Sequence, residues 1–292
     1  MPSSEFDESS GSALGVIAGG GILPLAVAQA ARDEGRNVFV LGIAGMVDEC
    51  DLEPFPHAIA GIGEIGKAMK ILRAARCTEV TFAGRVSRPK FSEVKLDAKG
   101  AMALPRVLNA ARNGDDALMR SILELFENDG FQIIGTDEAA ARLLVPAGIL
   151  GACKPDVQHN ADIRKALDVV HAMGLHDIGQ AAVVCEGVVL AVEAAEGTDA
   201  MLKRVEQLPD TLRGTPSARR GVLVKAPKPN QERRVDLPVV GMATMELVLA
   251  AGLSGIAVQA GATLILQRDA LIATANKSGI FLVGISSSEP AT

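Results

Sequence analysis

Short apolar runs alternate with helix-like segments through the first half of the chain, and this alternation is the strongest constraint on the fold. Runs dominated by Val, Ile, Leu and Phe, without a polar residue at every second position, are typical of strands buried on both faces. Strands that alternate with helices predict a parallel sheet with helices on both faces. We therefore expect a Rossmann-like α/β domain over residues 13–144. Its strands are predicted at residues 14–18, 37–41, 80–83 and 131–134, and its helices at 25–34, 65–76, 115–128 and 138–144.

The second half also mixes strands and helices, but it contains an antiparallel signal. Residues 145–155 carry two prolines and two glycines with no clear period, so we expect a linker over 145–159. Beyond it, the apolar runs 181–185 and 188–192 are joined by Glu186-Gly187, which predicts a β-hairpin. Further strands and helices follow. We expect a C-terminal mixed α/β catalytic domain over residues 160–286.

Charge and aromatic content argue against a nucleic-acid partner. The chain carries 35 acidic and 29 basic residues, a net charge of −6, and it has no Trp or Tyr to stack on bases. Its four cysteines form no CxxC pair, as expected in a reducing cytoplasm. Residues 1–12 lack a signal-peptide pattern, and no apolar run approaches the roughly 20 residues of a membrane span. We expect a cytoplasmic protein.

Two glycine-rich turns follow strands and raise the question of a dinucleotide site. Gly20 and Gly21 stand just before a helix that begins near Pro24, where backbone N–H groups can cradle a phosphate. The alternative is that Gly20 and Gly21 only permit a tight strand-to-helix turn, as glycine can in any such turn. Residues 61–66 match GxGxxG in full, but no carboxylate ends the next strand to bind a ribose. Tight turns and close helix packing are therefore favoured there over an NAD(P)-dependent oxidoreductase.

Carboxylates gather directly after the predicted strand 188–192. Residues 193–199 contain Glu193, Glu196 and Asp199 together with the hydroxyl of Thr198. Such a cluster at a strand end can hold a hard cation or a phosphate ester. The alternative is that Thr198 or Asp199 only caps the following helix and that the glutamates are solvated.

Cations surround a second acidic position in the C-terminal half. Lys225 and Lys228 lie upstream of Asp236, which stands between apolar Val235 and Leu237. A carboxylate in such a segment is often partly buried, and burial is costly unless the charge is paired or bound to metal. This arrangement suits an anionic substrate with bound Mg²⁺, and a structural Arg–Asp pair is the alternative.

Other chemistries have weaker support in the sequence. The chain has no GxSxG nucleophile elbow and no HExxH zinc motif, so metal-assisted hydrolysis by carboxylates is the more natural reaction. Arg85, which follows the strand 80–83, is a further cation at a strand end. A non-catalytic nucleotide-sugar or lipid-binding protein is the other alternative, and it predicts binding without turnover or Mg²⁺ dependence.

The order of these segments resembles the UDP-2,3-diacylglucosamine pyrophosphohydrolases of lipid A synthesis, of the alphaproteobacterial type. The resemblance covers nearly all of the chain after Leu14. Its matching segments are residues 15–24, 63–67, 82–89, 114–118, 178–181, 193–199 and 235–241.

The resemblance implies a Mg²⁺-dependent diphosphatase with two domains and the lipid-bearing ligand between them. It implies that UDP-2,3-diacylglucosamine and water give UMP and 2,3-diacylglucosamine 1-phosphate (lipid X). The best catalytic candidate of the family maps to Asp236, and its ligand or metal contacts map to Gln180, Thr198 and Asp199. We expect Asp236 and Asp199 to hold Mg²⁺. Positive charge would come from Lys225, Lys228 or Arg85.

The same resemblance implies where the protein works. A substrate with two acyl chains resides in a membrane leaflet, so we expect peripheral contact with the cytoplasmic face of the inner membrane. Family analogy also implies a homodimer.

Overall fold

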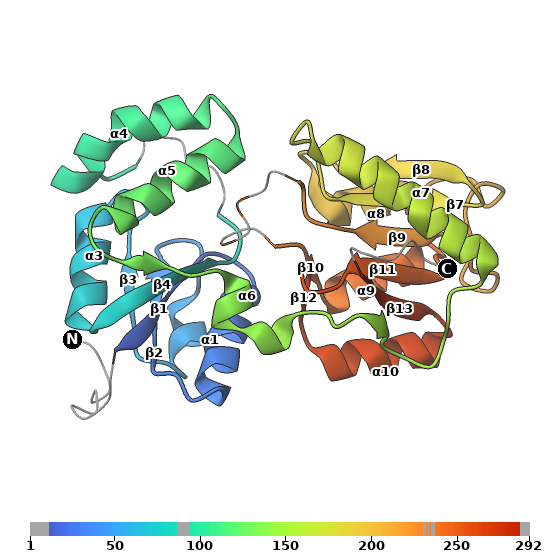
Figure 1. Cartoon of the computed structure of the whole chain (residues 1–292), viewed down its shortest axis with the longest axis horizontal. Helices are drawn as coiled ribbons and strands as arrows, with labels where there is room; N and C mark the ends of the chain where they lie inside the picture. Colours follow the sequence, from blue (N-terminus) through green and yellow to red (C-terminus); the bar gives the residue numbers. More distant parts are fainter. Residues whose placement is uncertain (1–11, 87–93, 230–231, 233, 235–236, 287–292) are drawn as a thin grey trace. The chain divides into compact units, whose positions relative to one another are not determined.

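The computed structural model describes residues 12–86, 94–229, 232, 234 and 237–286, and the chain divides into two compact units. The N-terminal unit contains Met1–Arg142 together with Glu232–Asp236. The C-terminal unit contains Leu143–Gln231 and Leu237–Thr292. Each unit is an α/β structure with its own sheet, as predicted (Figure 1).

The N-terminal unit is built on a five-stranded sheet with the order β3-β2-β1-β4-β5, in which every pairing is parallel. The central strand β1 is buried along its whole length, as a strand covered on both faces must be. This confirms the predicted Rossmann-like sheet. The strands are β1 (Ala13–Ala18), β2 (Val38–Ile43), β3 (His57–Ala60), β4 (Cys77–Ala83) and β5 (Gln132–Ile133).

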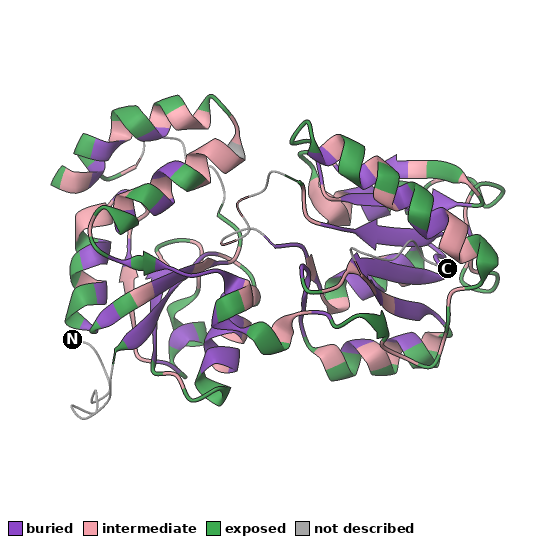
Figure 2. Ribbon diagram, in the orientation of Figure 1, coloured by how far each residue is buried: buried purple, intermediate pink, exposed green. Residues whose placement is uncertain are grey.

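Successive strand residues point to opposite sides of the sheet, so strands that are apolar throughout give it two apolar faces. Helices cover both of these faces. On one face, Met69 and Leu72 of α3 pack with Ile17 and Phe39, and α5 contributes Phe126 to the same core. Figure 2 shows that the central strands of the sheet are largely buried. Helix α1 packs on the strands from the other face. The helices are α1 (Leu23–Asp33), α2 (Glu49–Leu52), α3 (Ile65–Ala74), α4 (Ala98–Ala111), α5 (Asp115–Glu127) and α6 (Thr136–Ala139).

Two helical segments differ from the sequence predictions. Helix α4 has no counterpart among the sequence predictions, and it contains Gly100 and Pro105, which both disfavour a helix interior. It forms because Asp97 caps it and because it packs against α5. Residues 138–144 were expected as one helix, but they contain only the end of α6 and a 3₁₀ turn at Ala141–Leu143.

The C-terminal unit has a mixed six-stranded sheet with the order β6-β13-β11-β9-β7-β8. Three parallel strands, β9, β11 and β13, lie beside the antiparallel hairpin of β7 and β8. A separate pair joins β10 and β12. The strands are β6 (Gly148–Ile149), β7 (Ala181–Cys185), β8 (Val188–Val192), β9 (Val222–Lys225), β10 (Val239–Val240), β11 (Gly255–Gln259), β12 (Leu264–Ile265) and β13 (Phe281–Ile285).

Four helices pack against this sheet, and their apolar side chains complete two clusters of the core. Helix α7 begins earlier than predicted because Asp156 and His159 form a reciprocal capping box. Strand β6 lies within the stretch that the sequence analysis assigned to a linker. The helices are α7 (Val157–Gly174), α8 (Gly197–Glu206), α9 (Met242–Ala250) and α10 (Arg268–Ser278). Within the described ranges, no helix combines the length and apolar character needed to cross a membrane.

The predicted β7–β8 hairpin is confirmed, and a buried carboxylate fixes its turn. Glu186 and Gly187 have φ values of 49° and 79°, which are positive at both central positions as a type I′ turn requires. Asp162 of α7 is only 1% exposed, and it accepts the N–H groups of Glu186 (2.9 Å) and Gly187 (2.7 Å). The side chain of Gln158 donates a third hydrogen bond to it (3.1 Å).

Replacing Asp162 with Ala should destabilise the protein by about 2–3 kcal/mol, because two turn N–H groups lose a charged acceptor. Urea unfolding measures this difference. Asp168→Ala, on the exposed side of the same helix, is the matched control and should change stability by less than about 0.5 kcal/mol. Equal unfolding free energies for the two variants would contradict the role of Asp162.

Candidate active site

Strand order brings three predicted site residues of the C-terminal unit to one edge of its sheet. Strand β9 ends at Lys225, and its antiparallel neighbour β7 begins opposite, at Ala181. The carbonyl oxygen of Gln180 accepts the N–H of the residue after Lys225 (3.0 Å). Glu193 follows β8, and its N–H donates to the carbonyl oxygen of Ala181 (2.9 Å). Gln180, Glu193 and Lys225 therefore meet where β9 ends.

Lys225 carries a buried positive charge next to the start of α8. The residue is 5% exposed, and its Nζ donates to Thr198 Oγ1 (2.9 Å) and to the carbonyl oxygen of Val239 (3.2 Å). Thr198 is the second residue of α8, whose N-terminus carries partial positive charge. A buried ammonium and a helix N-terminus both favour an anionic group between them. The arrangement is suited to a phosphate.

Two oxygen atoms at the same edge of the sheet lack a hydrogen-bond partner. Glu193 is 8% exposed and its Oε2 is unpartnered, and the Oε1 of Gln180 is buried and unpartnered as well. Such atoms cost free energy unless a ligand or water satisfies them. Gly179 allows the backbone before Gln180 to lie close to the backbone of Glu193, because a Cβ at Gly179 would lie 2.1 Å from the carbonyl oxygen of Glu193.

The predicted metal ligands are only partly within the described structure. Asp199 is half-buried in the first turn of α8, whereas Asp236 lies outside the described residues. Among the residues that are described, no group of three or more His, Cys, Asp and Glu side chains is arranged around a metal. The carboxylates of Asp199 and Glu193 are hard oxygen donors of the kind Mg²⁺ prefers, so their chemistry fits this ion.

The N-terminal unit brings together Gly20, Gly21 and Arg85. Gly20 and Arg85 exchange backbone hydrogen bonds (2.8 and 2.9 Å), so the N–H of Gly20 is already committed to the protein. Gly21 is exposed with φ of 90°, and a Cβ there would meet no atom within 4 Å. Of the two predicted glycines, only Gly21 keeps an open approach to its backbone.

The GxGxxG segment is occupied by a carboxylate of the protein itself. Asp97 accepts the N–H of Lys67 at the start of α3 (2.8 Å) and the N–H of Gly100 in α4 (2.8 Å). Burial alone would raise the pKa of Asp97, but backbone hydrogen bonds from Gly100, Lys67 and Gly66 outweigh it and lower the pKa. A Cβ at Gly66 would lie 3.1 Å from the Asp97 carboxylate. Glycine here serves close helix packing, which supports the packing interpretation over a dinucleotide site.

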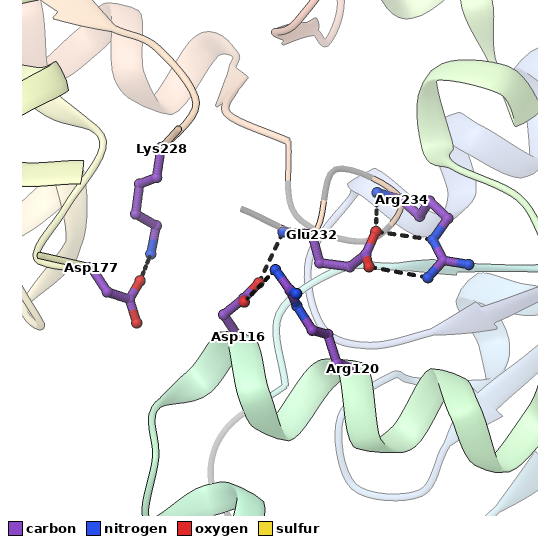
Figure 3. Close-up of polar contacts among 6 residues, drawn as sticks. All are labelled: Asp116, Arg120, Asp177, Lys228, Glu232 and Arg234. Carbon is purple, nitrogen blue, oxygen red and sulfur yellow. Dashed lines mark hydrogen bonds and ion pairs between the residues drawn. The ribbon is translucent and has the colours of Figure 1, made fainter. Parts of the chain in front are cut away.

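Lys228 is held by an ion pair within the C-terminal unit. Its Nζ contacts Asp177 Oδ1 at 2.5 Å (Figure 3). The side chain of Lys228 is 18% exposed and that of Asp177 is 46% exposed. Lys228 is thus bound to the segment that follows α7, whereas Lys225 is bound to Thr198 of α8 and Val239 of β10.

An ion-pair cluster in the N-terminal unit was missed by the sequence analysis. Asp116, in the first turn of α5 after the N-cap residue Gly114, accepts the backbone N–H of Glu232 at 2.9 Å (Figure 3). Arg234 pairs with Glu232 and with Glu127 of α5. In the sequence, the charged residues Glu232 and Arg234 shortly before Asp236 gave a signal for this cluster, but they did not indicate a partner on α5.

Comparison with known proteins identifies relatives along nearly the whole chain. The family model described as the LpxI N-terminal domain matches residues 13–143, and the model of the LpxI C-terminal domain matches residues 146–283. A protein of Caulobacter vibrioides named UDP-2,3-diacylglucosamine pyrophosphatase LpxI is 51% identical over 276 residues. That alignment covers 94% of this chain and 98% of the relative.

Replacing Asp97 with Ala should lower the unfolding free energy by about 1–3 kcal/mol, because α4 loses its cap and α3 loses an acceptor at its start. Asp97→Asn keeps one acceptor oxygen and should fall between Ala and the wild type. The pKa is lowered in the folded protein, so the stabilisation is full above the ordinary value of 3.8 and is lost as the pH falls below it.

Urea unfolding at pH 7 and near pH 3 tests both statements. Glu53→Ala, an exposed carboxylate of the same unit, is the control and should stay within about 0.5 kcal/mol of the wild type. A gap between wild type and Asp97→Ala that widens at low pH would contradict the assignment.

Proposed function

The chain belongs to the LpxI family, and from that membership we propose that it hydrolyses the diphosphate of UDP-2,3-diacylglucosamine in lipid A synthesis. The products are UMP and 2,3-diacylglucosamine 1-phosphate. The observation that carries the proposal is the 51% identity to the Caulobacter pyrophosphatase over 94% of this chain. The enzyme is thus a UDP-2,3-diacylglucosamine diphosphatase.

The edge of the C-terminal sheet supplies the electrostatics that this reaction needs. A diphosphate ester carries negative charge, and more develops on its oxygens as the bond between the two phosphorus groups breaks. The buried ammonium of Lys225 and the N-terminus of α8 are positioned to stabilise that charge. The unpartnered oxygens of Gln180 and Glu193 are suited to accept hydrogen bonds from hydroxyl or amide groups of the sugar.

We assign the water-activating role to a carboxylate, with Asp236 as the first candidate. In this proposal water attacks the phosphorus on the sugar side, Asp236 accepts the proton, and UMP leaves with the bridging oxygen. Mg²⁺, held by Asp236 and Asp199, would supply Lewis-acid stabilisation of the diphosphate. Arg85 and Gly21 of the N-terminal unit, and Lys228, are further candidates for substrate contact.

The substrate also sets the proposed location. Its two acyl chains anchor it in a leaflet, so we propose a cytoplasmic enzyme that makes peripheral contact with the inner membrane. A homodimer is proposed from family analogy alone.

Incubation of the purified protein with UDP-2,3-diacylglucosamine and Mg²⁺ should yield UMP and lipid X. Asp236→Asn should lower the rate by about 100-fold or more, because the variant cannot accept the proton. EDTA should have a comparable effect, and added Mg²⁺ should restore the rate. The products are resolved by thin-layer chromatography or mass spectrometry.

A negative result in each part of this assay would contradict a different part of the proposal. No turnover by a folded wild-type protein would overturn the proposed function and favour a binding protein. Full activity in EDTA would remove the metal from the mechanism. Full activity of Asp236→Asn would keep the reaction and exclude Asp236 as its base.

Lys225→Met removes the buried charge while keeping the length of the side chain, and it should lower kcat/KM by about 100- to 1,000-fold. Lys203→Met, on the exposed surface of α8, is the control and should leave kcat/KM within about 2-fold of the wild type. Initial rates over a range of substrate concentrations measure both. Equal kcat/KM values for the two variants would contradict the role of Lys225.

A further inference from the structure

Glu193 and Lys225 lie in one row across the C-terminal sheet. Ala181 of β7 pairs directly with Lys225 of β9, and the carbonyl oxygen of Ala181 accepts the N–H of Glu193 (2.9 Å). Residues directly opposite on paired antiparallel strands point to the same face of a sheet. The row therefore presents a carboxylate and an ammonium on one face. One strand separates them, so their backbones are about 10 Å apart.

Helix α8 covers the face to which both side chains point. Leu202 of α8 belongs to one core cluster with Leu223 of β9 and Ala191 of β8. Leu223 and Ala191 lie two positions before Lys225 and Glu193, so they share a face with them. The carboxylate and the ammonium thus both point to the side on which α8 packs.

The two ends of this row make opposite demands on a ligand. At one end, the ammonium of Lys225 is 5% exposed and donates to Thr198 Oγ1 (2.9 Å) at the positive end of α8, which favours an anion. At the other end, Glu193 is 8% exposed and its Oε2 has no hydrogen-bond partner. A buried carboxylate oxygen without a donor is costly. A ligand that satisfies both ends brings a negative charge and an O–H or N–H donor.

Protonation decides whether a phosphate group meets both demands. A phosphate monoester has a second pKa of about 6, so below that pH it is a monoanion with an O–H donor, and above it a dianion with acceptors alone. The dianion brings a second negative charge toward the carboxylate of Glu193 without a proton to share. A diphosphate diester has one charge on each phosphorus throughout this range, because neither phosphate has a second proton to lose.

We propose that Glu193 is a specificity-determining residue, which admits a phosphate group with one negative charge at Lys225 and disfavours a phosphate group with two. This inference rests on the proposed function. Each phosphorus of the substrate carries one charge, and Glu193 accepts a hydrogen bond from the sugar. Both products, UMP and 2,3-diacylglucosamine 1-phosphate, are monoesters that become dianions at neutral pH. Glu193 therefore promotes release of whichever product holds the phosphate at Lys225.

Other charged groups near the row are considered because the test varies pH. Glu196, which precedes α8, pairs with Arg204 of that helix. Histidine is the residue type that most readily changes its charge near neutral pH, and so a histidine variant belongs among the controls. Among the described residues at this end of the sheet and on the adjoining helices, the further charged or titratable groups are Asp199, Lys203 and Glu206 of α8, Glu246 of α9, and His176, Asp177 and Lys228.

The test measures binding to the full-length protein at pH 6 and pH 8 in EDTA by isothermal titration calorimetry. The probes are UMP and N-acetylglucosamine 1-phosphate, which carry the monoester groups of the two products. At least one of them should bind the wild type about 10-fold or more tightly at pH 6 than at pH 8, because the monoanion gives way to the dianion. UDP-N-acetylglucosamine, a diphosphate diester, should bind with affinities within about 3-fold at the two pH values.

Glu193→Gln removes the negative charge and keeps the shape of the side chain and one acceptor oxygen. At pH 8 it should bind that monoester about 10-fold more tightly than the wild type does, and its affinity should differ by less than about 3-fold between the two pH values. Glu206→Gln removes one charge from the exposed end of α8, and His176→Asn removes the exposed histidine. Both controls should keep the wild-type affinities within about 2-fold.

Turnover supplies a second readout. At pH 8, inhibition by that product should be about 10-fold stronger in Glu193→Gln than in the wild type, whereas KM for UDP-2,3-diacylglucosamine should change by less than about 3-fold. A purely structural role of Glu193 predicts the opposite pattern, with a raised KM and weaker inhibition by the product.

Each result decides a separate statement. Equal affinity of the wild type for the monoesters at pH 6 and pH 8, or an unchanged pH dependence in Glu193→Gln, would overturn the role of Glu193. Loss of the pH dependence in His176→Asn would assign it to the histidine instead. No binding of either monoester at either pH would overturn the phosphate site at Lys225. A folded wild-type protein without turnover would overturn the proposed function, while the binding data would still decide whether Glu193 selects the charge of the phosphate.

Discussion

The C-terminal site depends on one buried charge. Strand β9 is buried over all four of its residues, and it ends in a lysine that is only 5% exposed. An ammonium in such a place is costly unless oxygen atoms surround it. The hydroxyl of Thr198 and the carbonyl oxygen of Val239 meet part of that need, and so Lys225 links β9 to both α8 and β10. The same charge makes this edge of the sheet attractive to a phosphate.

The N-terminal unit uses its own carboxylates where a sequence motif points to ligands. A GxGxxG turn at a helix start is a natural anion site, and here Asp97 supplies the anion. Asp116 likewise accepts a backbone N–H from a distant part of the chain. Both cases follow from one rule: unpaired N–H groups require acceptors, and the nearest carboxylate can be intramolecular.

Local patterns predicted the elements but not the contacts between them. The buried strands, the Glu186-Gly187 turn and the mixed C-terminal sheet were predicted because each follows from a short stretch of sequence. Helix α4 was missed because Gly100 and Pro105 argue against a helix, and only the cap and the packing on α5 overrule them. The proximity of Lys225 and Thr198 depends on strand order. The bond from Glu232 to Asp116 joins residues 116 positions apart, and no periodicity reports it.

The division of the chain has a consequence for synthesis. The N-terminal unit is not made of one continuous segment, since it includes Glu232–Asp236 as well as Met1–Arg142. A ribosome delivers the whole five-stranded sheet early, but the last piece of that unit emerges only after most of the second sheet's sequence. During this interval Asp116 and Glu127 lack the contacts that Glu232 and Arg234 later supply. The two units therefore cannot mature strictly one after the other, and a cut placed between them at residue 142 would leave the first unit incomplete.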